Sequence, residues 1–334
     1  MPACLLAALL ATLLGCTPVG LTVRLGPVRD DLVPSPVMEL GQGPGRPSHR
    51  VAMVLVRGII TETPSPGLLG QGRSALDELA EQLQLAAKDP RVVAVVLRID
   101  SPGGSVAGSE TAYREVRAFT QTTGKPVVVS LGEVATSGGY FLALAGDHIL
   151  AEPSTLTGSI GVLIPTLNAS EGLARIGVYA RPLTSGPNKD LANPLTPPRP
   201  EHEQILQAIV HEFHNRFVSH VLRHRPTLDP RHVAQATDGR VMTGQTAAAI
   251  GLVDGLGDIR QAAEKAMTLA GVDHAVLVRY GPKASAPRTA YAQAQPDQPL
   301  AIDRSVSLLH LDGLGAAAMH LGLRPGVGYY LWLP

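Results

Sequence analysis

A serine and a lysine stand in settings that suit chemistry. Residues 135–140 read ATSGGY, which places Ser137 between an apolar run and two glycines. Residues 185–189 read SGPNK and end at Lys189. Serine is a poor nucleophile near neutral pH and needs a base to take its proton. With Lys189 as that base, the pair predicts a Ser/Lys hydrolase.

Lysine is favoured as the base because the histidines show no catalytic arrangement. Six of the eleven lie between His202 and His232, on or near one predicted helix. Some of their spacings suit a metal, but the His-Glu-x-x-His motif is absent. A solvated helix face is the favoured interpretation, and no metal or organic cofactor is expected.

A lysine amine becomes a base near neutral pH only when burial lowers its pKa from about 10.4. A neutral amine also needs a hydroxyl group to orient it. Residues 157–161 read TGSIG and offer either Thr157 or Ser159 for this role.

Two glycine-rich turns are candidates for an oxyanion hole. Residues 100–104 read DSPGG after an apolar run, and paired glycines let backbone N–H groups approach a developing negative charge. Gly138 begins a predicted helix, where N–H groups are unpaired. The plainer alternatives are an ordinary strand-to-helix turn at residues 100–104 and an N-cap role for Ser137.

Strand and helix patterns alternate through the first half of the chain. This alternation predicts an α/β fold with a parallel sheet. The predicted strands are 51–56, 92–99, 126–131 and 148–151, with 276–280 as a closing strand. One predicted helix begins at residue 73. Three more span residues 105–122, 137–145 and 201–222.

The first sixteen residues have the length and apolar character of a signal peptide, and they end in LLGC. This ending resembles the bacterial lipobox and marks Cys16 as the candidate lipidation site. The alternatives are an uncleaved anchor and a misplaced start. Six prolines between residues 17 and 50 predict a tether. We therefore expect an exported protein on the periplasmic side of the cell envelope, held to a membrane by lipid.

The composition narrows the class of protein. Forty-five per cent of the residues are hydrophobic, enough for a substantial core, and the formal net charge is zero. Nothing in this balance favours nucleic acid as a partner. The chain also lacks the Gly-x4-Gly-Lys-Ser/Thr loop of nucleotide hydrolases.

Taken in order, these motifs resemble the signal peptide peptidase A family of bacterial Ser/Lys proteases, over residues 51–275. A fifth segment, residues 239–254, resembles the C-terminal signature of that family. The resemblance implies Ser137 as nucleophile, Lys189 as general base and Ser159 as the group that orients the lysine. It assigns the oxyanion hole to the N–H groups of Gly104 and Gly138, with Gly103 as the alternative to Gly104.

The resemblance also implies a fold and an assembly. The expected fold is that of Clp proteases and crotonases, with stacked β-β-α units, mostly parallel buried sheets and outer helices. This chain has one serine motif and one lysine motif, and it resembles family members that assemble as rings. In such rings the serine and the lysine of each site come from neighbouring subunits. We therefore expect a homo-oligomeric ring in which Ser137 and Lys189 lie well apart within one chain.

The expected function is a membrane-tethered serine endopeptidase that cleaves remnant signal peptides and similar unfolded peptides. One rival is a crotonase-like acyl-CoA enzyme on the same fold, with Glu133 as the nearest carboxylate; the other is a non-catalytic envelope scaffold. The predicted divisions are 1–16 signal peptide, 17–50 tether, 51–275 peptidase domain and 276–334 C-terminal extension. The apolar tail at residues 328–334 has no assigned role, and an edge strand is the default.

Overall fold

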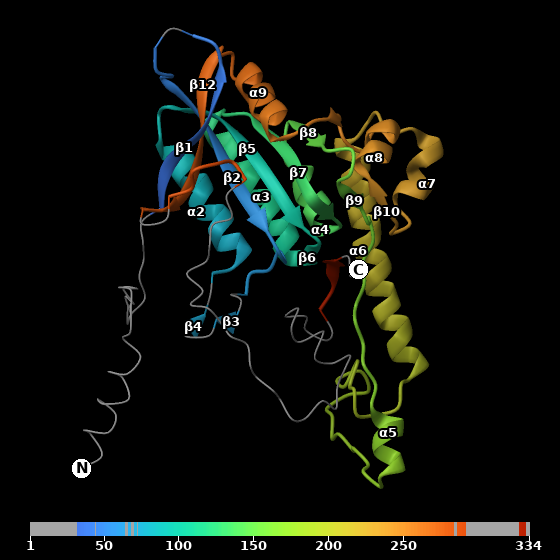
Figure 1. The fold of residues 1–334 in the computed structure, drawn as a ribbon. Coiled ribbons are helices and arrows are strands. Elements are labelled where there is room, and N and C mark those ends of the chain that lie inside the picture. Colours follow the sequence, from blue (N-terminus) through green and yellow to red (C-terminus); the bar gives the residue numbers. More distant parts are fainter. Residues whose placement is uncertain are drawn as a thin grey trace, which may run out of the picture.

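One mixed β-sheet with helices on both faces forms the body of the chain (Figure 1). The computed structural model describes residues 32–43, 45–63, 66–67, 70–71, 73–283, 286–291 and 327–331. Seven strands cross the sheet in the order β1-β12-β2-β5-β7-β8-β11, and β9 and β10 extend it beside β7. These strands are β1 (Leu32–Gly41), β2 (His49–Arg57), β5 (Val92–Ser101), β7 (Val127–Thr136), β8 (His148–Ala151), β9 (Leu156–Gly158), β10 (Val241–Thr243), β11 (Gly255–Leu256) and β12 (His274–Pro282).

The centre of the sheet is parallel, and helices connect its strands. β2, β5, β7 and β8 are neighbours in parallel register. Parallel neighbours require a crossover, and here helices supply it. The crossover helices are α2 (Ala75–Lys88), α3 (Val106–Thr123) and α4 (Gly138–Ala143). The predicted α/β fold class, with a mostly parallel sheet and outer helices, is confirmed.

Side chains that alternate along the strands supply two cores, one on each face of the sheet. On β2, Ala52 and Val54 pack in the core on the side of α2 and α3. Val51 and Met53 pack in the other core, which α9 (Ile259–Leu269) covers. Because both faces are buried, the strands appear in the sequence as unbroken apolar runs.

The sheet includes strands that lie partly or wholly outside residues 51–275, the predicted peptidase domain. β1 lies within the predicted tether and pairs antiparallel with β12. Pro34 and Pro36 are compatible with a strand here because β1 is at the edge of the sheet, where a missing N–H donor costs little. β12 lies between β1 and β2 and completes the sheet. Residues 1–31, which include the predicted signal peptide and the candidate lipidation site Cys16, lie outside the described residues.

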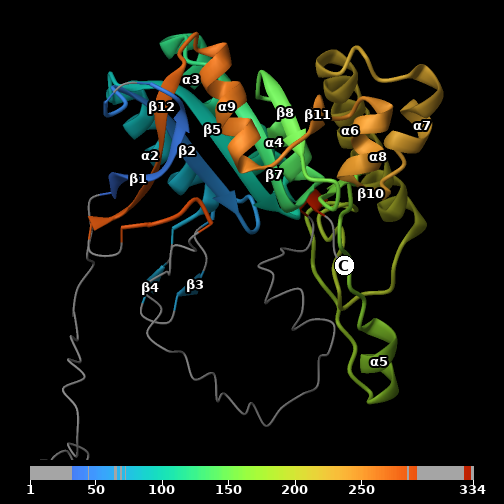
Figure 2. The same ribbon diagram turned by 45° about the horizontal axis from the view of Figure 1, so that its top comes forward.

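A long arm leaves the body after β9 and returns through the longest helix (Figures 1 and 2). We define the arm as residues 164–199. It contains α5 (Ser170–Arg175) and leads into α6 (Pro200–His224), followed by α7 (Val233–Ala236) and α8 (Gly244–Ile250). No helix among the described residues combines the length and apolar character needed to cross a bilayer.

Candidate active site

Ser137 lies at a strained elbow between β7 and α4. Its backbone has φ 52° and ψ −115°, a region that non-glycine residues rarely adopt. The Ser137 N–H donates to the carbonyl oxygen of Gly158 at 2.8 Å, which fixes the elbow against β9. Its side chain makes no capping hydrogen bond, so the N-cap interpretation is wrong. The Ser137 hydroxyl is buried and has no hydrogen-bond partner among the described residues.

Two glycines beside this serine leave no room for a side chain. A Cβ atom on Gly138 would lie 2.3 Å from Ser109 Oγ and 3.0 Å from the Gly104 nitrogen. A Cβ atom on Gly104 would lie 1.9 Å from the carbonyl oxygen of Ile60. The backbones of Gly104 and Gly138 therefore approach each other closely, as an oxyanion hole requires.

The N–H group of the neighbouring glycine, Gly103, already has a hydrogen-bond partner within the chain. The Gly103 N–H donates to Ser101 Oγ at 3.1 Å, and the same hydroxyl donates to the carbonyl oxygen of Gly58 at 2.6 Å. This bond favours Gly104 over Gly103 as the oxyanion donor. Ser105 also caps α3, since its hydroxyl accepts from the Gly108 N–H at 3.1 Å.

Ser159 follows β9 and is the second strained serine of the site, with φ 52°. Its N–H donates to the carbonyl oxygen of Arg240 at 2.7 Å. Arg240 precedes β10, which pairs antiparallel with β9. The conformation of Ser159 therefore depends on the segment at residues 239–254, for which the sequence indicated only a resemblance to a family signature.

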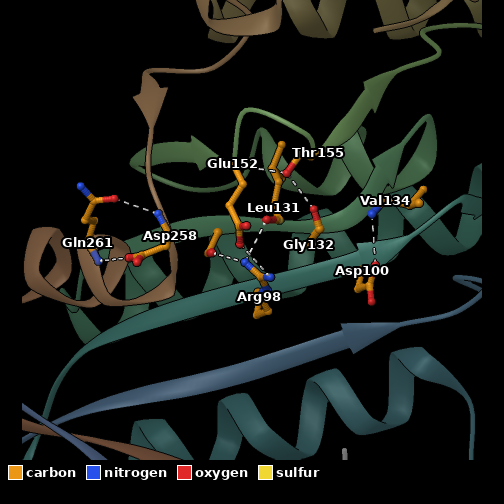
Figure 3. A network of polar contacts seen from close by, with 10 residues as sticks. Arg98, Asp100, Leu131, Gly132, Val134, Glu152, Thr155, Asp258 and Gln261 are labelled. Atoms are coloured by element: carbon orange, nitrogen blue, oxygen red, sulfur yellow. Dashed lines mark hydrogen bonds and ion pairs between the residues drawn. The ribbon is translucent and has the colours of Figure 1, made fainter. Parts of the chain in front are cut away.

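A polar network holds the loop between β8 and β9 against β5 and β7 (Figure 3). Arg98 on β5 donates to the carbonyl oxygen of Leu131 at 2.9 Å and contacts Glu152 at 3.5 Å. Thr155 accepts from the Glu152 N–H and donates to the carbonyl oxygen of Gly132 at 2.8 Å. These bonds connect β5, β7 and the loop, so that β9 reaches the serine elbow in a fixed register.

Lys189 lies away from Ser137 Oγ, in an exposed position on the arm. Its loop is held to the start of α6, where Arg199 forms an ion pair with Asp190 at 2.8 Å. His202 also contacts the carbonyl oxygen of Pro187 at 2.9 Å. Because Ser137 Oγ has no hydrogen-bond partner among the described residues, this single chain does not bring the lysine and serine into contact.

The histidines of α6 do not form a solvated face, which corrects that interpretation. His220 stacks on Phe141 with ring centroids 4.3 Å apart, and His224 contacts the Tyr113 hydroxyl at 2.8 Å. Burial lowers the pKa of His220 to about 4. Among the described residues no three side chains of His, Cys, Asp or Glu gather as a metal site.

The fifth motif, residues 239–254, makes contacts that hold parts of the fold together. Tyr140 in α4 is fully buried and its hydroxyl donates to the carbonyl oxygen of Leu252 at 2.7 Å. Asp254 accepts from the Ile149 N–H at 2.7 Å and pairs with Arg225 at 3.1 Å. The segment thus joins the helix behind Ser137 to β8 and α6.

The sequence reasoning assigned no site role to Ser109 or Tyr330. Ser109 is fully buried with no partner for its hydroxyl among the described residues. Tyr330 belongs to β13 (Tyr329–Leu331), which pairs with β6 (Gly103–Ser105). The cluster of aromatic residues in the tail is the sequence feature that could have indicated a role for Tyr330.

Comparisons with known proteins agree with this geometry. The model of peptidase family S49 matches residues 120–273. Protease 4 of Salmonella typhi is 38% identical over 221 residues, which are 66% of this chain and 34% of that protein. The putative signal peptide peptidase SppA of Enterococcus faecium is 30% identical over 236 residues, 71% of this chain and 68% of that protein. The putative protease slr0021 of Synechocystis is 38% identical over 186 residues, covering 56% of this chain and 66% of that protein.

Together with the elbow at Ser137, these matches place the chain in a family of serine peptidases. The chain belongs to peptidase family S49. It spans about a third of the length of the Salmonella relative.

Proposed function

We propose that this chain is a serine endopeptidase in which Ser137 is the nucleophile and Lys189 the general base. The observation that carries the proposal is the strained, buried Ser137 beside the closely spaced backbones of Gly104 and Gly138. Strain at such a position is typical of a functional residue. Its unpartnered hydroxyl is available for a base that arrives from outside the chain.

In the proposed reaction, Ser137 Oγ attacks the peptide carbonyl carbon while its proton passes to the Lys189 amine. The N–H groups of Gly104 and Gly138 stabilise the negative oxygen of the tetrahedral intermediate. The intermediate collapses to an acyl-enzyme as the lysine ammonium protonates the leaving amine. A water molecule, deprotonated by the same lysine, then attacks the ester and releases the acyl product.

The proposal requires a second copy of the chain. A lysine amine is a base near neutral pH only where burial lowers its pKa, and Lys189 is exposed here. The arm that carries it also exposes large apolar side chains, including Ile176, Tyr179 and Leu183 at 73%, 80% and 93%. A neighbouring subunit that covers this arm would bury the lysine beside a second Ser137. We therefore propose a homo-oligomeric ring with sites shared between subunits.

The proposed substrates are unfolded peptides, including remnant signal peptides, at the periplasmic side of a membrane. The lipobox-like LLGC segment supports lipidation of Cys16 and a membrane tether. The crotonase-like alternative gains no support, because Glu133 is exposed rather than directed into the site.

Hydrolysis of fluorescently labelled, denatured casein tests the proposal. We expect Ser137→Ala and Lys189→Ala each to reduce the rate at least 1000-fold, since removal of a nucleophile or base costs several orders of magnitude. Lys88→Ala, at an exposed position at the end of α2, is the matched control and should keep full activity. Full activity in the Lys189 variant would exclude it as the base. If folded, assembled wild-type protein cleaves nothing, the scaffold function replaces the peptidase.

A further inference from the structure

The loop that carries Lys189 has a defined fold of its own, at the point where the arm returns to α6 (Figure 2). The Lys189 N–H donates to the carbonyl oxygen of Gly186 at 3.2 Å. Directly after the lysine, the Asn193 N–H donates to the carbonyl oxygen of Asp190 at 3.0 Å. Two turns therefore fix the backbone on both sides of the proposed base.

The same loop contains a strained residue. Ala192 has φ 58°, and among the described residues only Ser137 and Ser159 share a positive φ without being glycine. Backbone strain of this kind is concentrated at functional sites. The three strained residues are thus the proposed nucleophile, the serine expected to orient the lysine, and a close neighbour of the lysine itself.

Asp190 brings a carboxylate next to the proposed base in the sequence. A carboxylate within about 4–6 Å of a lysine favours the ammonium over the amine that a base requires. In the structure Arg199 engages this carboxylate in an ion pair of 2.8 Å. The Asp190 side chain is 16% exposed and lines a cavity of about 120 Å³ at the start of α6, whereas Lys189 is exposed. The carboxylate and the amine therefore lie in different surroundings.

Further contacts hold Arg199 in place. Its guanidinium also contacts the carbonyl oxygen of Pro187 and the imidazole of His202. His202 is buried, and its Nε2 atom contacts the Pro187 oxygen at 2.9 Å. Arg199 is thus bound to the loop before the lysine as well as after it, and all of these contacts lie within one chain.

The remaining charges at this junction do not reach the lysine. The first turn of α6 adds the carboxylates of Glu201 and Glu203, which line cavities beside the loop. The facing segment of the arm, residues 166–168, adds no charged side chain to the cavity that Asp190 lines. Within the part of the chain that the structure describes, no ion pair joins Lys189 to any carboxylate.

We propose that Arg199 is a positioning residue for the base, which holds the Asp190 carboxylate so that Lys189 stays unpaired and can enter the neighbouring site as an amine. A guanidinium suits this role because it remains charged at every relevant pH and matches the geometry of a carboxylate. The inference rests on the proposed function for the role of Lys189.

The pH dependence of kcat/KM tests the inference in the assembled, full-length protein. Hydrolysis of labelled, denatured casein is followed from about pH 6 to pH 10, where the rise on the acidic side reports the base. Arg199→Gln keeps an N–H donor but leaves the Asp190 charge without a counter-charge. We expect this variant to move the acidic limb to higher pH by about one pH unit.

A second substitution separates this electrostatic role from simple fastening of the loop. Arg199→Gln combined with Asp190→Asn removes both charges, so the acidic limb should return to its wild-type position. Arg231→Gln is the matched control, because it breaks an exposed ion pair with Asp229 of 2.6 Å elsewhere in the chain and should leave the limb unchanged.

An unshifted acidic limb in Arg199→Gln would overturn the inference. A double variant shifted as far as Arg199→Gln would overturn it too, because the ion pair would then only fasten the loop. If circular dichroism shows that Arg199→Gln is not folded, Asp190→Asn decides. It should lower kcat/KM by less than about threefold, since asparagine still accepts a hydrogen bond from Arg199, and a larger loss contradicts the inference.

The Lys189→Ala variant keeps the two proposals distinguishable. If it remains active, another group is the base and the proposed function fails. If it is inactive while Arg199→Gln keeps the wild-type pH profile, only the role of Arg199 fails.

Discussion

At the scale of single residues, the site depends on backbone conformations that the sequence only partly reveals. Ser137, the proposed nucleophile, and Ser159, which is expected to orient the lysine, both have φ 52°. The flanking glycines indicated a close approach of the backbone at residues 137–139. They did not indicate that the serine itself is strained, because a positive φ at a non-glycine residue arises from the surrounding structure.

The strain at Ser137 predicts an order of stability among its variants. A rarely populated φ/ψ pair costs about 1–3 kcal/mol, and alanine keeps the Cβ atom that causes it. Glycine removes this strain but adds about 0.5–1 kcal/mol of unfolded-state entropy. We expect Ser137→Gly to have a free energy of unfolding about 1 kcal/mol above that of Ser137→Ala. Urea unfolding measures it, and a glycine variant less stable than the alanine variant contradicts this account of the elbow.

At the scale of elements, the buried parallel strands were predictable because they appear as unbroken apolar runs. The predicted strand 148–151 coincides with β8, and the predicted helix 201–222 lies within α6. β1 was missed because Pro34 and Pro36 indicate a linker unless the strand is known to lie at an edge. The position of β13 was unpredictable, since three residues carry no periodic signal and their partner is more than two hundred residues away.

The long helix shows why a histidine pattern alone was misread. The spacing of the histidines and the polarity of the helix could not show that His220 packs on Phe141, because that contact depends on how α6 crosses α4. The burial that follows lowers the pKa of His220 to about 4, from an ordinary value of 6.5, with His224 and Arg223 contributing. The folded state therefore keeps this imidazole neutral where the unfolded state binds a proton.

This pKa predicts a pH dependence of stability. Between pH 6.5 and 4 the unfolded state binds more protons, so the free energy of unfolding falls as the pH falls through this range. His220→Phe keeps a ring against Phe141 and removes the titration. We expect the loss of stability between pH 7 and pH 4.5 to be smaller in this variant by on the order of 1 kcal/mol, discounted for partial exposure. An identical loss in both proteins, measured by urea unfolding, argues against a neutral, buried His220.

At the scale of the whole molecule, the serine elbow and the lysine arm are separate parts of one chain. The body holds Ser137, Gly104 and Gly138 in fixed positions, whereas Lys189 is on an exposed arm. A heterologous contact, in which the arm of one subunit reaches the body of the next, closes into a ring when the rotation permits. The proposed ring would account for both the apolar exposure of the arm and the lack of a hydrogen-bond partner for the Ser137 hydroxyl among the described residues.

Complementation between two inactive variants tests this central claim most directly. Ser137→Ala and Lys189→Ala chains, each with a different affinity tag, are co-expressed and purified through both tags. If sites are shared between neighbours, random assembly pairs an intact serine with an intact lysine at about a quarter of the sites. We predict that the mixed assembly recovers about a quarter of the wild-type rate on labelled casein. A doubly tagged assembly no more active than either variant alone would contradict a Ser137–Lys189 site formed between subunits.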